Sequence, residues 1–225
     1  MSEKLFTTGR KKNTRGAFSV SCAGGAELVK RLRKLENGGE KAIKSTVSEF
    51  TSRAPAWVSK GIREHYGVDA AAIKDAAQRP KRGKTTIKVA GVTVDGATLE
   101  YSGRLLTPLH FKMSPKERPK GKKAYKIRAT IIKGQRTALP SDTFLGRPKQ
   151  EEKENGKASK KASKKESEGL TLPYQRKGPD RYPLEVIRTL SVPQMIDGRA
   201  HDTVYDLISE NLGKRFQHHV SRAMK

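Results

Sequence analysis

The chain has little cysteine and no long apolar run. Its single cysteine, Cys22, excludes an internal disulfide framework and a zinc site built from several thiolates. No window approaches the roughly 18 consecutive apolar residues of a membrane helix, and residues 1–12 contain no apolar signal-peptide core. We therefore expect a soluble, unprocessed protein with no membrane partner.

Negative charge and aromatic residues are scarce as well. The chain carries 48 Lys and Arg residues against 23 Asp and Glu, a formal net charge of +25. Such a surplus makes copies of the chain repel one another unless an anionic partner offsets it. With 34% hydrophobic and 6% aromatic residues, its 225 residues can bury one modest core. The expected partner is a nucleic acid or an acidic protein surface, and the composition does not decide between them.

Hydrophobic periodicity indicates an α+β fold with N-terminal helices, a central, mostly antiparallel β-sheet and a long C-terminal amphipathic helix packed on that sheet. Pro55 is expected to break or kink the second helix before the apolar period resumes at Trp57. Apolar residues recur at helical spacing in four segments, 26–35, 40–51, 70–77 and 202–224.

Alternating apolar residues predict strands in the middle and late parts of the chain. Residues 85–103 have the pattern of a hairpin with its turn at Asp95-Gly96. Residues 124–134 predict a strand with one apolar and one basic face. A further strand is expected from Tyr182 until it ends near Pro193.

Two segments are too polar to contribute to a core. Residues 1–23 are expected to form a basic N-terminal arm, extended or disordered, and residues 147–169, rich in Lys, Glu and Ser, a flexible insertion of the disordered type. A single domain is therefore predicted over residues 24–225.

The sequence shows none of the common catalytic motifs. There is no GxSxG, HExxH, Walker or GxGxxG pattern, and no carboxylate cluster that suggests a nuclease metal site. His219 lies on the apolar stripe of the terminal helix, where a satisfied core histidine is the more common role than a metal ligand. Cys22 has no histidine near it in sequence to activate it. We expect no catalytic residue, metal or cofactor, and no enzyme activity.

Clustered basic residues are the candidates for contacts with nucleic acid. They could line a surface that faces phosphates without reading base sequence. Tyr101 and Tyr125 occur at strand spacing among apolar residues, which favours a core or sheet-face role over a platform for stacked bases. The candidate DNA or lumen contacts are Arg79, Lys81, Arg82, Lys84, Lys116, Arg118, Lys120, Lys122 and Lys123.

The C-terminal third, GPDRYPLEVIRTLSVPQM followed by LGKRFQHHVSRAMK, resembles the ending of the minor tail protein Z family of lambda-like bacteriophages. In that family a basic Arg-Tyr-Pro strand leads through a Ser-Val-Pro or Ala-Val-Pro turn into a long helix. Upstream, LLTPLHF is similar to the family's Pro-Leu-x-Phe element. The residues that carry the C-terminal match are Arg181, Tyr182, Pro183, Val186, Val192, Pro193, Leu212 and Phe216.

The resemblance implies a virion protein that completes the tail at the neck, after a stay in the host cytoplasm during assembly. Its copies would form a homo-oligomeric ring, six-fold like the tail tube, between the tail terminator or tube protein and the head-tail connector. The ring would help to join tail and head and to seat the DNA end through non-specific contacts. Structural or interface roles are expected for Arg181, Tyr182, Pro183, Val192, Pro193 and Phe216.

For Arg181, Tyr182 and Pro183 we expect a structural role, holding the start of the last strand against the terminal helix, with a partner contact as the competing interpretation. The alternative for the whole chain is a free protein that binds nucleic acid non-specifically through its basic surface. The neighbours in the particle, and the roles of residues 1–23 and 147–169, stay open.

Overall fold

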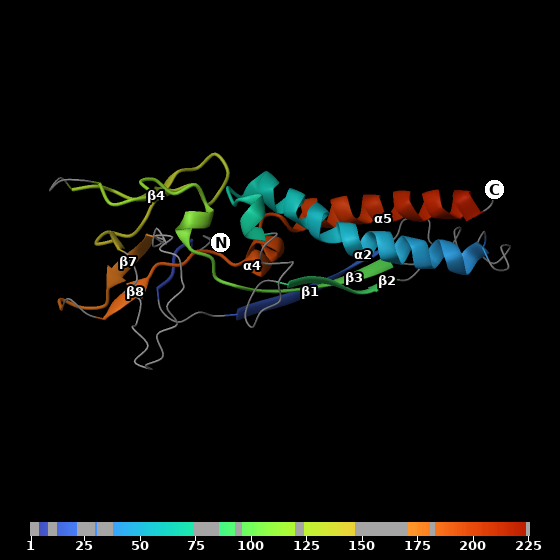
Figure 1. Ribbon diagram of the computed structural model, residues 1–225, viewed down its shortest axis with the longest axis horizontal. Helices are drawn as coiled ribbons and strands as arrows, with labels where there is room; N and C mark the ends of the chain where they lie inside the picture. Colours follow the sequence, from blue (N-terminus) through green and yellow to red (C-terminus); the bar gives the residue numbers. More distant parts are fainter. Residues whose placement is uncertain are drawn as a thin grey trace, which may run out of the picture.

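The computed structural model describes residues 5–8, 13–21, 30, 38–73, 86–92, 96–119, 124–146, 171–180 and 183–223. Two long helices, α2 (Gly38–His65) and α5 (His201–Ala223), lie side by side at one end of an elongated molecule. Short strands occupy the opposite end (Figure 1). The predicted α+β class is confirmed.

A three-stranded antiparallel sheet with the order β1-β3-β2 underlies the helix pair. Its strands are β1 (Asn13–Ser21), β2 (Thr86–Val92) and β3 (Gly96–Arg104). Along β3, Leu99 and Tyr101 are buried while Glu100 between them is exposed, because alternate side chains of a strand point to opposite faces. The predicted hairpin of residues 85–103 is thereby confirmed as β2 and β3.

The prediction for residues 1–23 is wrong in its middle part. Residues 13–21 are a strand of the sheet rather than an arm, since β1 pairs with β3 from Asn13↔Arg104 to Ser21↔Gly96. Val20 is buried, and Phe18 packs on Tyr101 with ring centroids 5.9 Å apart. Apolar residues at every second position, in a segment otherwise rich in Arg, Ser and Thr, gave only a weak strand signal.

The helix pair provides much of the core. α5 runs antiparallel to α2, with Val204 close to Gly61 and Arg215 close to Glu49. A β-carbon on Gly61 would lie 2.7 Å from Cγ2 of Val204, so this glycine permits the close approach of the two helices. The predicted apolar stripe of α5 is confirmed by five buried residues, Val204, Ile208, Leu212, Phe216 and Val220.

The terminal helix also meets the sheet, as expected. Tyr205 packs on Phe18 of β1, and the Ser209 hydroxyl donates to the Ser21 carbonyl over 3.2 Å. The pairing of α5 with α2 along its length was not anticipated.

Pro55 does not break the second helix, which corrects the expected break. α2 continues through Pro55 to His65. An interior proline costs about 3 kcal/mol through its missing hydrogen bond and its steric clash. Burial of a large apolar side chain stabilises by about 1.5–3 kcal/mol, and Phe50, Val58 and Ile62 of the same helix are all fully buried. Tertiary packing therefore outweighs the local preference.

The far end of the molecule is built from short strands. β6 (Phe144–Gly146), β7 (Leu172–Arg176) and β8 (Leu184–Val186) form a second antiparallel sheet. β4 (Arg128–Ala129) pairs with β5 (Thr137–Ala138), and a 3-10 turn, η1, spans Pro108–His110. The predicted strand at 124–134 is therefore only two residues long, although Ile127, Ala129 and Ile131 are buried on one face as expected.

The last predicted strand also ends earlier than expected. After β8, Ser191 caps the short helix α4 (Val192–Asp197), so Val192 and Pro193 begin a helix rather than end a strand. The Ser191 hydroxyl accepts from the Gln194 amide over 3.3 Å, and the Gln194 side chain accepts from the Ser191 amide over 2.9 Å. Proline is compatible with the first turn of a helix because its missing N–H has no partner there.

Several predictions fall outside the described residues. Of the helix expected at 26–35 only Lys30 is described, and it is helical; of that expected at 70–77, residues 70–73 are described and helical. The insertion at 147–169 and Cys22 lie outside the described residues. Within the described part of the chain, no helix is both long and apolar enough to cross a membrane.

Candidate functional site

Two of the predicted basic contact residues are described. Lys116 and Arg118 are exposed in the segment between η1 and β4. The other seven candidates lie outside the described residues: Arg79, Lys81, Arg82, Lys84, Lys120, Lys122 and Lys123.

Arg118 lines a cleft of about 690 Å³ at the strand end of the molecule, which we call the basic cleft. Its floor comes from the second sheet. The register Phe144↔Tyr174, together with Arg176↔Leu184 in the next strand pair, places Phe144, Arg176 and Leu184 on one face. The residues that line the cleft are Arg118, Tyr125, Asp142, Phe144, Gln175, Arg176, Gly178, Pro179 and Leu184.

Cations and aromatic rings meet in this cleft. The Arg176 guanidinium lies 5.9 Å from the centre of the Phe144 ring, within the range of a cation–π contact. Phe144 in turn stacks on Tyr174, with centroids 6.3 Å apart. Exposed guanidinium groups can bind phosphates, and ring faces can stack on bases, which is how proteins hold single-stranded nucleic acid without reading its sequence. The Asp142 carboxylate weakens the positive potential of the cleft.

The two tyrosines weighed as base platforms are structural. Tyr101 is buried in the first sheet, where its hydroxyl donates to the carboxylate of Asp197, and burial together with this hydrogen bond raises the pKa of Tyr101. The Tyr125 hydroxyl accepts a hydrogen bond from the Leu145 amide over 3.1 Å, although its ring reaches the basic cleft.

Sequence reasoning missed Phe144 and Arg176 as cleft residues. Nothing in the local sequence pattern indicated that Arg176 lies near Phe144. Their proximity depends on the pairing of β6 with β7. These strands are neighbours in the sheet, although 25 residues separate Gly146 from Leu172 in the sequence.

The residues expected to be structural divide into two groups. Val192 and Pro193 of α4 and Phe216 of α5 are buried. Pro183 is exposed beside β8, and its carbonyl accepts from the Lys177 amide over 3.3 Å, so its described contact is with the end of β7. Arg181 and Tyr182 lie outside the described residues, and their predicted role in holding the start of the strand stays a prediction.

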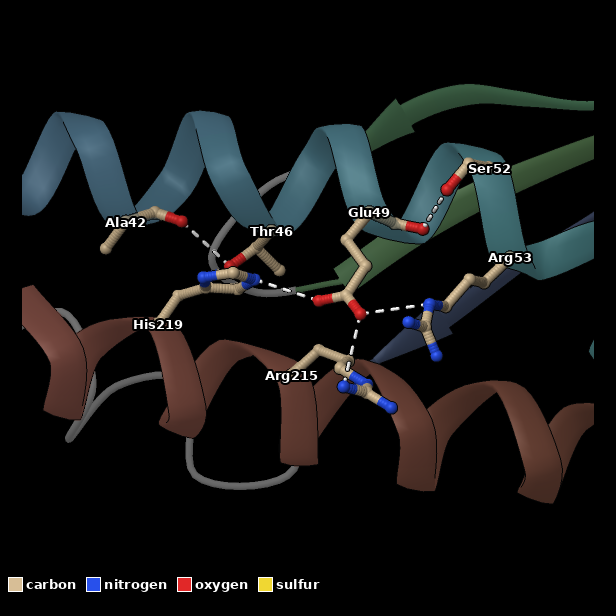
Figure 2. A network of polar contacts seen from close by, with 7 residues as sticks. All are labelled: Ala42, Thr46, Glu49, Ser52, Arg53, Arg215 and His219. Carbon is tan, nitrogen blue, oxygen red and sulfur yellow. Dashed lines mark hydrogen bonds and ion pairs between the residues drawn. The ribbon is translucent and has the colours of Figure 1, made fainter.

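One polar network joins α2 to α5 and contains the histidine singled out in the sequence (Figure 2). Glu49 of α2 accepts from Nε2 of His219 over 2.9 Å and pairs with Arg215 of α5 at 3.1 Å. It also pairs with Arg53 on its own helix at 3.0 Å. The hydrogen bond from His219 is the main reason why the pKa of Glu49 lies below its ordinary value, and Arg215 and Arg53 lower it further.

A histidine paired with a carboxylate can act as a general base, but the nearby hydroxyl is not placed to give its proton to His219. The Thr46 hydroxyl on the same side of α2 donates to the Ala42 carbonyl over 2.8 Å, so its proton is already engaged within the helix (Figure 2). A nucleophile for His219 would need its proton directed at the imidazole. The network is therefore a clamp between helices, and the prediction that His219 is a satisfied histidine is confirmed.

In the described ranges no group of three or more His, Cys, Asp and Glu side chains is placed to hold a metal ion. No family model, curated protein or solved structure matches the chain.

Proposed function

We propose that the chain is a structural subunit of a long-tailed bacteriophage, a tail-completion protein whose copies form a ring at the head-proximal end of the tail tube. The proposal starts from the resemblance of the C-terminal third to the minor tail protein Z family. The matching residues Val186, Val192 and Pro193 belong to β8 and α4, the segment that connects the strand end of the molecule to α5.

The observation that carries the proposal is the edge of β1. Among the described residues, the first sheet has β1 and β2 as its outer strands. The ladder of β2 is interrupted between Val89 and Gly91, a bulge of the kind that protects an edge from further pairing. β1 instead pairs with β3 in continuous register over nine residues, which leaves a regular outer edge.

A regular edge strand can accept a strand or loop from a neighbouring copy. Head-to-tail contacts of this kind close into a ring when the rotation between subunits permits it. In such a ring the basic cleft would supply non-specific contacts to the DNA end, because exposed arginines bind backbone phosphates whatever the base sequence.

Complementation of phage assembly tests the proposal. In a phage that encodes the chain, a stop codon early in its gene should leave filled heads and complete-length tails that fail to join, and purified chain added to the lysate should restore joined, infectious particles. Joined particles in the absence of the chain would contradict the proposal.

The same experiment distinguishes the alternative. A free nucleic-acid-binding protein would be missing from purified particles, and its loss would alter DNA or RNA metabolism in infected cells rather than the junction. The basic cleft is the observation that favours this second function.

A further inference from the structure

Arg188 is held between two neighbouring segments of chain. On one side it exchanges backbone hydrogen bonds with Thr7, over 2.8 and 2.9 Å. On the other side, the next residue, Thr189, donates its amide to the Leu106 carbonyl over 2.8 Å. The backbone that presents the Arg188 side chain is therefore fixed on both sides.

The Arg188 guanidinium is placed in a costly environment. Its Nε is buried and has no hydrogen-bond acceptor in the part of the chain that the structure describes. The charge that acts on its pKa comes from another cation, Arg104 at the end of β3. Burial first, and Arg104 second, lower the pKa of Arg188. A buried donor without an acceptor costs about 1–3 kcal/mol, more when it is charged.

Arg188 also continues the face that forms the basic cleft. Leu184 lines the cleft, and Leu184, Val186 and Arg188 are alternate residues of one extended segment. Alternate side chains along extended backbone point to the same side. The intervening Ile187 is fully buried, as expected for a residue on the opposite side.

We propose that Arg188, together with Arg104, binds a backbone phosphate of DNA, at the edge of the basic cleft. A phosphate oxygen would accept from the part of the Arg188 guanidinium that is not buried, and its negative charge would offset the positive charges of the two arginines. A carboxylate from a protein partner has similar chemistry. The net charge of +25 and the neighbouring Arg118 and Arg176 favour an extended polyanion with repeated charges over a single acidic side chain.

The inference rests on the DNA contact in the proposed function but not on the ring. It is tested with the purified full chain and short DNA duplexes of two unrelated sequences, by fluorescence anisotropy across a salt titration. Arg188→Gln is compared with Arg136→Gln, which removes the same charge from an exposed position before β5.

Arg188→Gln should weaken binding about five- to tenfold for both sequences and lower the slope of log K against log salt by about one, as for the loss of one phosphate contact. Arg104→Gln should act in the same direction. Without DNA, the melting temperature of Arg188→Gln should equal or exceed that of the wild type, because the repulsion is relieved. Arg136→Gln should leave the slope nearly unchanged.

Equal effects of Arg188→Gln and Arg136→Gln on the salt slope would overturn the phosphate site. So would a failure of the wild-type chain to bind duplex DNA. If Arg188→Gln binds DNA normally but fails to restore head-tail joining in the lysate, the site accepts an acidic protein partner instead; the phosphate site is then overturned while the proposed function stands.

Discussion

Glu49 and His219 are 170 residues apart in the chain, yet Oε2 of one lies 2.9 Å from Nε2 of the other. The contact fixes how far α5 is shifted along α2, because Arg215, one turn before His219, binds the same carboxylate. Apolar stripes alone leave this shift weakly determined, since buried aliphatic side chains can repack at a one-turn displacement.

Replacement of Glu49 by Gln should lower the free energy of unfolding by about 1–3 kcal/mol near neutral pH, the usual cost of losing hydrogen bonds to a charged group. The effect should depend on pH. The folded-state pKa of Glu49 is below its ordinary value of 4.5, so the stabilisation is complete above pH 4.5 and is lost as the pH falls through the lower folded-state value.

Urea unfolding of the wild type and Glu49→Gln over a range of acidic pH measures this difference. Glu210→Gln is the matched control, because Glu210 pairs with Lys214 one turn away on the exposed face of α5, and no change in stability is expected. A stability difference between wild type and Glu49→Gln that stays constant down to low pH would contradict the clamp.

Gly16 of β1 lies directly opposite Tyr101 of β3. A β-carbon at Gly16 would overlap the Tyr101 ring, which is itself buried and hydrogen-bonded to Asp197. Gly16→Ala should therefore destabilise the protein by about 1–3 kcal/mol, as overpacking of a core does. Gly91→Ala in β2 is the control, because a β-carbon there would meet nothing within 4 Å. Similar melting temperatures for the two variants would show that β1 is not packed in this register.

Ser191 connects α4 to β1. Besides capping α4, its hydroxyl lies 2.5 Å from the Thr14 hydroxyl of β1. Ser191→Ala should cost about 1–2 kcal/mol in thermal or urea unfolding, the range for loss of a helix N-cap. Ser52→Ala removes an exposed hydroxyl that only donates to the Glu49 carbonyl, and should change stability by less than about 0.5 kcal/mol. A neutral Ser191→Ala would argue against α4 as the link between the two sheets.

Arg118 and Arg176 should contribute to DNA binding through phosphate contacts at the basic cleft. The double variant Arg118→Gln/Arg176→Gln should lower the slope of log K against log salt by about two, and equally for unrelated duplexes. Lys133→Gln/Arg136→Gln removes the same total charge from exposed positions around the turn before β5. If both double variants lower the slope equally, net charge rather than the cleft governs binding.

Sequence patterns predicted the elements that bury one face over a long run. α5 was predictable because Val204, Ile208, Leu212, Phe216 and Val220 recur on one stripe. The hairpin of β2 and β3 was predictable from alternation around Asp95-Gly96. Pro55 was misjudged because the proline rule is local, whereas the burial that carries α2 through it depends on the helix partner and the sheet.

The candidate sites were less predictable than the fold. Arg118 was identified as part of a basic cluster. Arg176 became a candidate because it lies over Phe144 of β6, and Arg188 because of its contacts with Thr7 and the charge of Arg104 in β3. Likewise, nothing around Glu49 in sequence indicates that its partners are Arg215 and His219. Such pairings depend on strand register and on the relative position of helices, which single-sequence patterns do not contain.

The central claim is most directly tested by an electron-microscopy reconstruction of purified particles of a phage that encodes the chain. The account predicts a ring of this chain between the head-tail connector and the tail tube, with Arg118, Arg176 and Arg188 directed towards the DNA end. Particles that lack the chain at the neck, or a ring with these arginines directed away from the DNA, would contradict it.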